Sequence, residues 1–295
     1  MSNCDSKNEG ISGVATRFGG ESPDDDAMCV LAILYKVARN TPILVATNRE
    51  ERLDRPTQAP RIQSGTPRVV CGIDQIKGGT WLGVNQFGLF ATVTNRHKTL
   101  VPADARSRGL LCRELLATRD AKEAAELAAN ELSTGRYAGA NYICADGESA
   151  AVVYGGNRVE VVQIEPGLHI ITDGDLNDSR DQRHAFIRRM LTLHTLDSAV
   201  TFLAVASRAF SRKSDASGRR GTVITGDEYG TVSSTLLSLP HKIQQAVFQY
   251  APGPPSDNAY DDLSALLRQV LSTNRSRRNS NGNNGGKTKK NGKKK

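Results

Sequence analysis

The apolar positions of this chain form two kinds of block, one with the period of a β-strand and one with the period of a helix. Short apolar runs bounded by Gly, Pro, Asn or Asp predict strands, and they lie at residues 29–37, 41–48, 68–73, 80–85, 88–95, 140–146, 149–156, 158–164, 167–172, 221–226, 229–239 and 242–251. Apolar residues spaced by three or four predict helices at residues 107–132, 178–192 and 196–210. The order strands, helices, strands, helices, strands favours an α+β sandwich of stacked antiparallel sheets over a βαβ array. The Arg- and Pro-rich stretch 49–67 is expected to be irregular.

The basic character of the chain belongs to its C-terminal end. The 295 residues carry a formal net charge of +8, and residues 274–295 hold nine Lys and Arg with no acid, which leaves about −1 for residues 1–273. We therefore divide the chain into a disordered leader or misassigned start (1–28), one domain (29–272) and a disordered basic tail (273–295). The tail is either a solvated segment without a partner or a weak contact for nucleic acid or anionic surfaces.

Several classes of protein are excluded by what the sequence lacks. No run approaches the roughly 20 apolar residues of a transmembrane segment, and residues 1–28 lack the basic and apolar regions of a secretory signal. We therefore expect an intracellular, cytoplasmic protein. The five cysteines are widely spaced without a CxxC pair, and the five histidines show no metal-ligand spacing, so neither a metal nor a cofactor is assigned.

Cys29 stands at the boundary between the acidic leader and the first apolar run, in the stretch DDDAMCVLAILYKV. An N-terminal cysteine combines a thiol with a free α-amine that can take the thiol's proton, so no separate histidine is needed. Cys29 becomes such a residue if Met28 is the true start and is trimmed, or if the leader is a propeptide. If residues 1–28 stay attached, the nitrogen is an amide and cannot act as a base.

Six segments occur along the chain in one order: MCVLAILYK, ATNREERLDRP, GGTWLGVNQFGLFATVTN, SRG, GANYICAD and EYGTVSST. In this order the chain resembles the NRDE-motif family, also called the transport and Golgi organisation protein 2 family, over about Met28 to Tyr250. The resemblance implies a four-layer αββα sandwich of the N-terminal nucleophile (Ntn) hydrolase type, similar to penicillin V acylase and bile salt hydrolase.

For function, the resemblance leaves two classes open. The first is a hydrolase of linear, non-peptide amide bonds that depends on Cys29. The second is a non-catalytic binding or trafficking protein, with a Golgi-organisation-like role, whose cleft holds heme or another hydrophobic ligand. The expected partner is accordingly a small-molecule amide or a hydrophobic ligand.

The resemblance also implies roles for individual residues. Asn48, Arg49, Glu50 and Glu51 occupy the family's Asn-Arg-Asp-Glu motif, with Glu50 in place of Asp. Cys29 would attack an amide carbonyl, Arg49 would keep the thiolate charged and Glu50 would hold the α-amine. The alternative interpretation of the motif is a surface salt-bridge cluster.

Further candidate positions lie later in the chain. Asn95 matches an oxyanion-hole amide of related acylases, or else ends its strand in a turn. Asp173 stands where acylase relatives carry Asn, and a carboxylate there would repel a developing oxyanion. Val232 stands where the family often has Arg, and Trp81 either anchors the sheet or forms a wall of the site. The substrate-binding positions are assigned to Asn48, Trp81 and Asn141.

Overall fold

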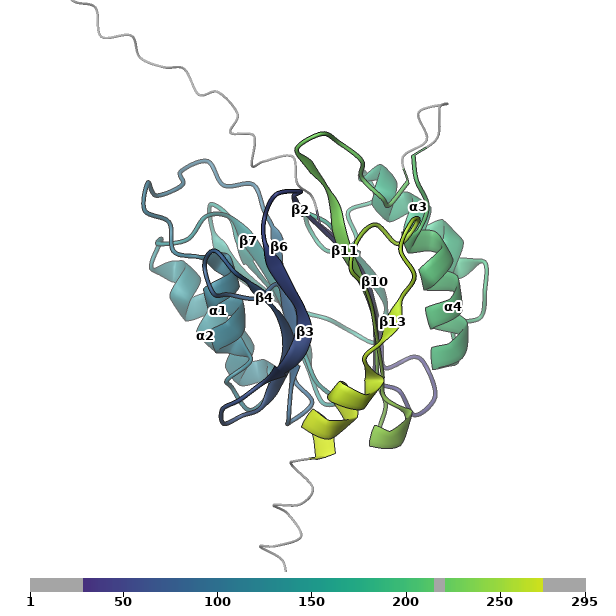
Figure 1. Cartoon of the computed structure of the whole chain (residues 1–295). Coiled ribbons are helices and arrows are strands. Elements are labelled where there is room, and N and C mark those ends of the chain that lie inside the picture. The colour runs from purple at the N-terminus through teal and green to yellow at the C-terminus, as the bar shows by residue number, and fades with distance from the viewer. Residues whose placement is uncertain (1–28, 215–220, 273–295) are drawn as a thin grey trace, which may run out of the picture.

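The computed structural model describes residues 29–214 and 221–272, and it contains two antiparallel β-sheets packed face to face (Figure 1). Helices α1 (Arg108–Leu115) and α2 (Ala121–Ser133) cover the outer face of one sheet. Helices α3 (Gln182–Thr192) and α4 (Ala199–Phe210) cover the outer face of the other. The layer order is therefore α, β, β, α, which confirms the predicted four-layer sandwich.

Each sheet is a continuous array of antiparallel strands. Sheet A has the order β10 (Gly167–Ile171), β1 (Val30–Tyr35), β2 (Ile43–Arg52), β11 (Tyr229–Leu239), β12 (Val247–Ala251) and β13 (Asp261–Asp262). Sheet B has the order β3 (Thr57–Gln63), β4 (Val69–Asp74), β5 (Leu82–Asn85), β6 (Phe90–Asn95), β7 (Ala140–Ala145), β8 (Ala150–Gly155) and β9 (Val159–Gln163). The central strands β1, β2 and β11 therefore lie deep in sheet A.

The central strand β1 of sheet A is apolar on both faces because both faces are covered. In β1, Leu31 and Ile33 belong to the core between the sheets, whereas Ala32 and Leu34 belong to the core beneath α3 and α4. Full burial of such a side chain stabilises the fold by about 1.5–3 kcal/mol. This double burial explains why the sequence shows continuous apolar runs here instead of alternation.

Polar caps determine where the helices begin. The Asp181 side chain accepts hydrogen bonds from the backbone N–H groups of Arg183 and His184, so α3 begins at Gln182 and not near residue 178. The Ser198 hydroxyl accepts from the Thr201 N–H, which starts α4 at the next residue. Such caps stabilise a helix by about 1 kcal/mol each. The cap residue therefore fixes where each helix begins, although the apolar spacing in the sequence starts a few residues earlier.

Four segments differ from the pattern-based expectation. Residues 57–63, expected to be irregular, form the edge strand β3, where Pro60 is tolerated because an edge leaves one row of N–H groups unpaired. Residues 221–226, expected to be a strand, form only an isolated bridge between Val223 and Lys213. The expected strand 242–251 begins instead with a short 3-10 helix, and residues 264–272 form a helix that was not predicted.

The predicted leader (1–28) and tail (273–295) lie outside the described residues, so these boundaries stay predictions. None of the helices that the structure describes is long and apolar enough to cross a bilayer.

Candidate functional site

Cys29 lies in a cleft of about 360 Å³ at one end of the space between the sheets. One wall comes from sheet A and carries Cys29, Arg49, Glu50, Glu51 and Tyr229. The opposite wall comes from sheet B and its loops and carries Asp74, Lys77, Thr80, Trp81, Asn95 and Arg108. The cleft therefore collects side chains from both sheets beside a single cysteine.

The β1–β2 hairpin brings the Asn-Arg-Glu-Glu motif beside Cys29, as the sequence predicted. Val30 pairs with Asn48 across the two strands, so the residue before Val30 lies next to Arg49. The Cys29 thiol donates a hydrogen bond to the Glu50 carbonyl oxygen at 3.7 Å. In contrast to the expectation, the motif lies within β2 and not at its end, because the strand continues to Arg52 through its pairing with β11.

Arg49 crosses the cleft and links its two walls. Its guanidinium lies 4.4 Å from the centre of the Trp81 ring and 3.1 Å from a Glu51 carboxylate oxygen. Glu51 in turn lies 3.5 Å from Arg55, whose guanidinium is 2.8 Å from Asp74. A guanidinium stacked on an indole and paired with a carboxylate is held in a fixed orientation, so Arg49 presents its charge to the cleft without a large rearrangement.

The Glu50 carboxyl group is buried on the side of β2 that faces Thr231. Its Oε1 accepts a hydrogen bond from the Thr231 hydroxyl at 3.0 Å, and its Oε2 has no hydrogen-bond partner among the described residues. Burial raises the pKa of Glu50 to about 8, against the opposing influence of the Arg183 charge and the Thr231 hydroxyl. The group is therefore a carboxylic acid near neutral pH, and its free oxygen is available to an added donor.

The thiol of Cys29 is held in its neutral form while a peptide bond precedes it. Burial, together with the negative charge that Glu50 carries above its own pKa of about 8, raises the pKa of the thiol to about 12, and the positive charge of Arg49 opposes this rise. No histidine lines the cleft among the described residues. The usual imidazole base for a thiol is therefore missing from this part of the cleft.

The predicted site residues do not all reach the cleft. Asn95 and Trp81 line it, as does the motif from Arg49 onward. Asn48 lies on the other face of β2, where its Nδ2 donates to the carbonyl oxygens of Phe210 and Thr222 at 3.0 Å each. Such a pair of bonds holds the chain after α4 against sheet A, so the position of Asn48 is that of a structural cross-link.

Asn141 and Asp173 also lie outside the cleft lining. The Asn141 amide is buried, donates to the carbonyl oxygens of Asn95 and Gly174, and accepts from Arg96. Asp173 follows β10, which pairs with β1 up to Leu31 and Ile171. Val232 lies at the bulge where the pairing of β11 with β2 shifts its register.

Sequence reasoning did not identify the loop side of the cleft. Lys77 comes from the β4–β5 loop, and Ser107, Arg108 and Gly109 come from the start of α1. The available signal was the segment SRG, which we interpreted as a helix cap. The cap is present, since the Ser107 hydroxyl accepts a hydrogen bond from the Leu110 N–H at 3.3 Å. The next residue, Arg108, also lines the cleft, which the sequence interpretation did not include.

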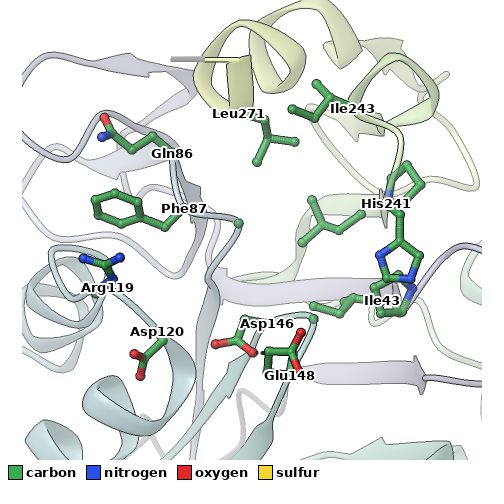
Figure 2. Close-up of a pocket in the computed structure, with 15 residues that line it drawn as sticks. Ile43, Gln86, Phe87, Arg119, Asp120, Asp146, Glu148, His241, Ile243 and Leu271 are labelled. Carbon is green, nitrogen blue, oxygen red and sulfur yellow. Dashed lines mark hydrogen bonds between the residues drawn. The ribbon is translucent and has the colours of Figure 1, made fainter. Parts of the chain in front are cut away.

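A second cavity of about 570 Å³ lies at the opposite end of the sandwich (Figure 2). It is lined by Ile43 at the start of β2 and Leu239 at the end of β11, whereas the cleft lies where β2 ends and β11 begins. Figure 2 shows Arg119 and His241 on opposite sides of this cavity. It contains no cysteine, so the candidate site is the smaller cleft.

The fold and the cleft define an α+β protein of four αββα layers, with a cysteine directly before the central strand β1. The family model described as Transport and Golgi organisation 2 matches residues 28–249, and the chain belongs to this family. A transport and Golgi organization protein 2 homolog from Bos taurus is 32% identical over 154 residues, which cover 48% of this chain and 55% of the bovine protein. The Homo sapiens homolog is 29% identical over the same length. The chain thus spans about half the length of the relatives it matches.

Two solved structures are similar to this chain over most of its length. The penicillin V acylase from Agrobacterium tumefaciens has a TM-score of 0.46 at 14% identity, covering 81% of this chain and 88% of the acylase. The Caenorhabditis elegans ortholog of N-acylethanolamine-hydrolyzing acid amidase has a TM-score of 0.49 at 14% identity, covering 74% of this chain and 98% of the amidase. The fold assignment rests on the chain's own layer order and sheet topology.

Proposed function

We propose that this protein is a cysteine amidohydrolase of the N-terminal nucleophile type, which acts on linear, non-peptide amide bonds once Cys29 carries a free α-amine. The observation that carries the proposal is the position of the Cys29 thiol in the cleft, where the charges of Arg49 and Glu50 both act on it, with the guanidinium of Arg49 held against Trp81 and the carboxyl of Glu50 buried. These groups supply what an N-terminal nucleophile needs, namely a positive charge beside the sulfur and an acceptor beside the amine.

The chemistry follows from the groups in the cleft. The α-amine of Cys29 takes the thiol proton, and the thiolate attacks the amide carbonyl carbon to form a C–S bond while the carbonyl electrons move to oxygen. Collapse of this intermediate breaks the C–N bond, and the leaving amine takes the proton from the ammonium. Water, deprotonated by the same amine, then attacks the thioester, which releases a carboxylic acid and restores the thiol.

Two side chains assist these steps in distinct ways. Asn95 is a neutral side chain on the wall opposite Cys29, and an amide donor placed at a developing oxyanion is worth about 3–4 kcal/mol. Glu50 offers its free Oε2 to the α-ammonium that exists once Cys29 is the first residue. Asp173 does not line the cleft, so the repulsion expected from a carboxylate at this position does not oppose the reaction.

The leader decides between this proposal and a non-catalytic role for the same cleft. With Met28 attached, the nitrogen of Cys29 is an amide and the pKa of the thiol is about 12. The part of the cleft lining that the structure describes offers no histidine in its place. A chain that keeps its leader would therefore bind ligands in the cleft without turning them over.

Identification of the N-terminus of the protein isolated from its own source tests the proposal. Intact mass and N-terminal sequencing should give a chain that begins at Cys29, and iodoacetamide at pH 7.5 should label Cys29 faster than the buried Cys71, Cys112 and Cys144. A mature chain that still carries residues 1–28 would refute the nucleophile role and leave the binding role.

A further inference from the structure

The charges in the cleft do not balance. Five basic side chains line it, and three of them have an acidic partner: Arg49 with Glu51 at 3.1 Å, Arg55 with Asp74 at 2.8 Å and Arg106 with Glu131 at 2.8 Å. The other two, Lys77 and Arg108, form no ion pair with any acid of the described residues. The only remaining acid of the lining is Glu50, which burial keeps protonated up to a pKa of about 8. The cleft is therefore positively charged at neutral pH.

The two unpaired cations belong to the wall opposite the nucleophile. Lys77 is exposed in the β4–β5 loop, and Arg108 is the first residue of α1. Arg108 uses one guanidinium nitrogen to donate to the Gly139 carbonyl at 3.1 Å, which fixes the side chain and leaves its two other nitrogens without a hydrogen-bond partner among the described residues. The loops that hold both residues are themselves joined, because the Thr80 N–H donates to the Gly109 carbonyl at 2.9 Å.

The start of α1 adds to the positive potential of this wall. The first turn of the helix contains no acidic residue, so the positive end of the helix dipole at Ser107, Arg108 and Gly109 is not neutralised there. The two ionised acids of the lining, Glu51 and Asp74, are already paired with arginines. An anion bound at this wall would meet two cations and a helix N-terminus and no free carboxylate.

We infer that the cleft selects amides that carry a carboxylate, with the scissile carbonyl at Cys29 and the carboxylate at Lys77 and Arg108. This inference names the substrate class of the proposed amidohydrolase and so rests on that function for turnover, but the recognition itself requires only binding. A guanidinium fixed at one nitrogen can donate to a carboxylate with the remaining two, and the ammonium of Lys77 supplies a second charge.

The test compares two probes that differ only in charge, N-octanoylglycine and its neutral primary amide. Their dissociation constants are measured by calorimetry on the full chain carrying Cys29→Ala, so that hydrolysis cannot contribute. N-octanoylglycine should bind about tenfold or more tightly than the amide, since charge-assisted hydrogen bonds are the stronger kind. The preference should shrink as NaCl is raised from 0.05 to about 0.5 M.

Substitutions assign the preference to the two cations. Lys77→Met and Arg108→Met should each reduce the preference several-fold and leave the affinity for the neutral amide unchanged, whereas Lys122→Met, an exposed lysine on α2, should leave both affinities unchanged. Arg108→Lys, which keeps the charge, should retain part of the preference. Thermal unfolding of each variant verifies the fold, and Lys77→Met tests the inference even if Arg108→Met does not fold.

The outcomes separate this inference from the proposed function. Equal affinity for the two probes, no measurable binding of either, or a preference that Lys77→Met leaves undiminished would overturn the inference. A carboxylate preference in a chain that never hydrolyses amides would keep the inference and refute the enzyme. Hydrolysis of the neutral amide as fast as of N-octanoylglycine would keep the enzyme and overturn the inference.

Discussion

Replacement of Glu50 by Gln isolates the effect of one buried carboxyl group on stability. Glu50 is 4% exposed, accepts one hydrogen bond from Thr231 and leaves its second oxygen without a partner. Glutamine has nearly the same shape and can still accept from Thr231, but it does not ionise. The substitution therefore removes the titration and keeps the packing.

The magnitude follows from the two pKa values. Glu50 titrates near 4.5 in the unfolded chain, and burial raises its pKa to about 8 in the fold. Because the folded value lies above the unfolded one, the folded state holds the proton more tightly. The stability from this group is fully present below pH 4.5 and is lost as the pH rises through about 8. The loss amounts to about 1.4 kcal/mol per pH unit in this window, with an upper limit of about 5 kcal/mol.

Equilibrium unfolding in urea between pH 4.5 and 8.5 measures this loss. The free energy of unfolding of the parent chain should fall relative to Glu50→Gln as the pH rises, because all other titrating groups are common to both. Glu126→Gln, an exposed glutamate on α2, serves as the control and should run parallel to the parent. Parallel curves for Glu50→Gln, or a parent chain that gains stability with pH relative to it, would refute a buried neutral carboxyl.

Three further predictions concern the surroundings of the cleft. Asn48→Ala should lower the free energy of unfolding by about 1–3 kcal/mol in urea titrations, because two buried carbonyl oxygens lose their donor; an unchanged midpoint would contradict the cross-link. Gly72→Ala should displace Trp81, since an added Cβ would lie 2.3 Å from its ring. The displacement should appear as a shift in tryptophan fluorescence. Gly147→Ala, where the added Cβ meets open space, is the control and should show no shift. In a chain that retains residues 1–28, Cys29 should react with iodoacetamide at pH 8 about a thousandfold more slowly than in urea, because its pKa rises from 9.0 to about 12; equal rates would show that the thiol is not buried.

The layers of the fold could be predicted because the sheets come from short apolar runs and the helices from apolar residues spaced by three or four. Continuous apolar runs at 29–37 and 41–48 predicted buried strands, and the structure has β1 and β2 there. The edge strand β3 could not be recognised, since its residues are polar or only partly buried and include Pro60. Residues 221–226 were predicted as a strand that the structure does not contain, because this short apolar run forms only an isolated bridge and joins neither sheet.

The candidate site could be predicted where it depends on neighbouring strands and not where it depends on loops. A hairpin places Arg49 beside Cys29 by simple register. Strand alternation, in contrast, turns Asn48 away from the cleft, and a motif match does not report which face a residue takes. Lys77 and Arg108 reach the cleft only because the β4–β5 loop meets the start of α1, a contact between segments that local patterns do not contain.

Direct observation of an acyl-enzyme tests the central claim, which is that Cys29 acts as an N-terminal nucleophile on amides. A chain that begins at Cys29 is incubated with p-nitroanilides of straight-chain acids, quenched in acid and digested for mass spectrometry. We predict an added acyl group as a thioester on the Cys29 peptide, absent from Cys29→Ala and from the chain that keeps residues 1–28. A chain beginning at Cys29 that forms no adduct, or an adduct that forms equally with the leader attached, would contradict the account.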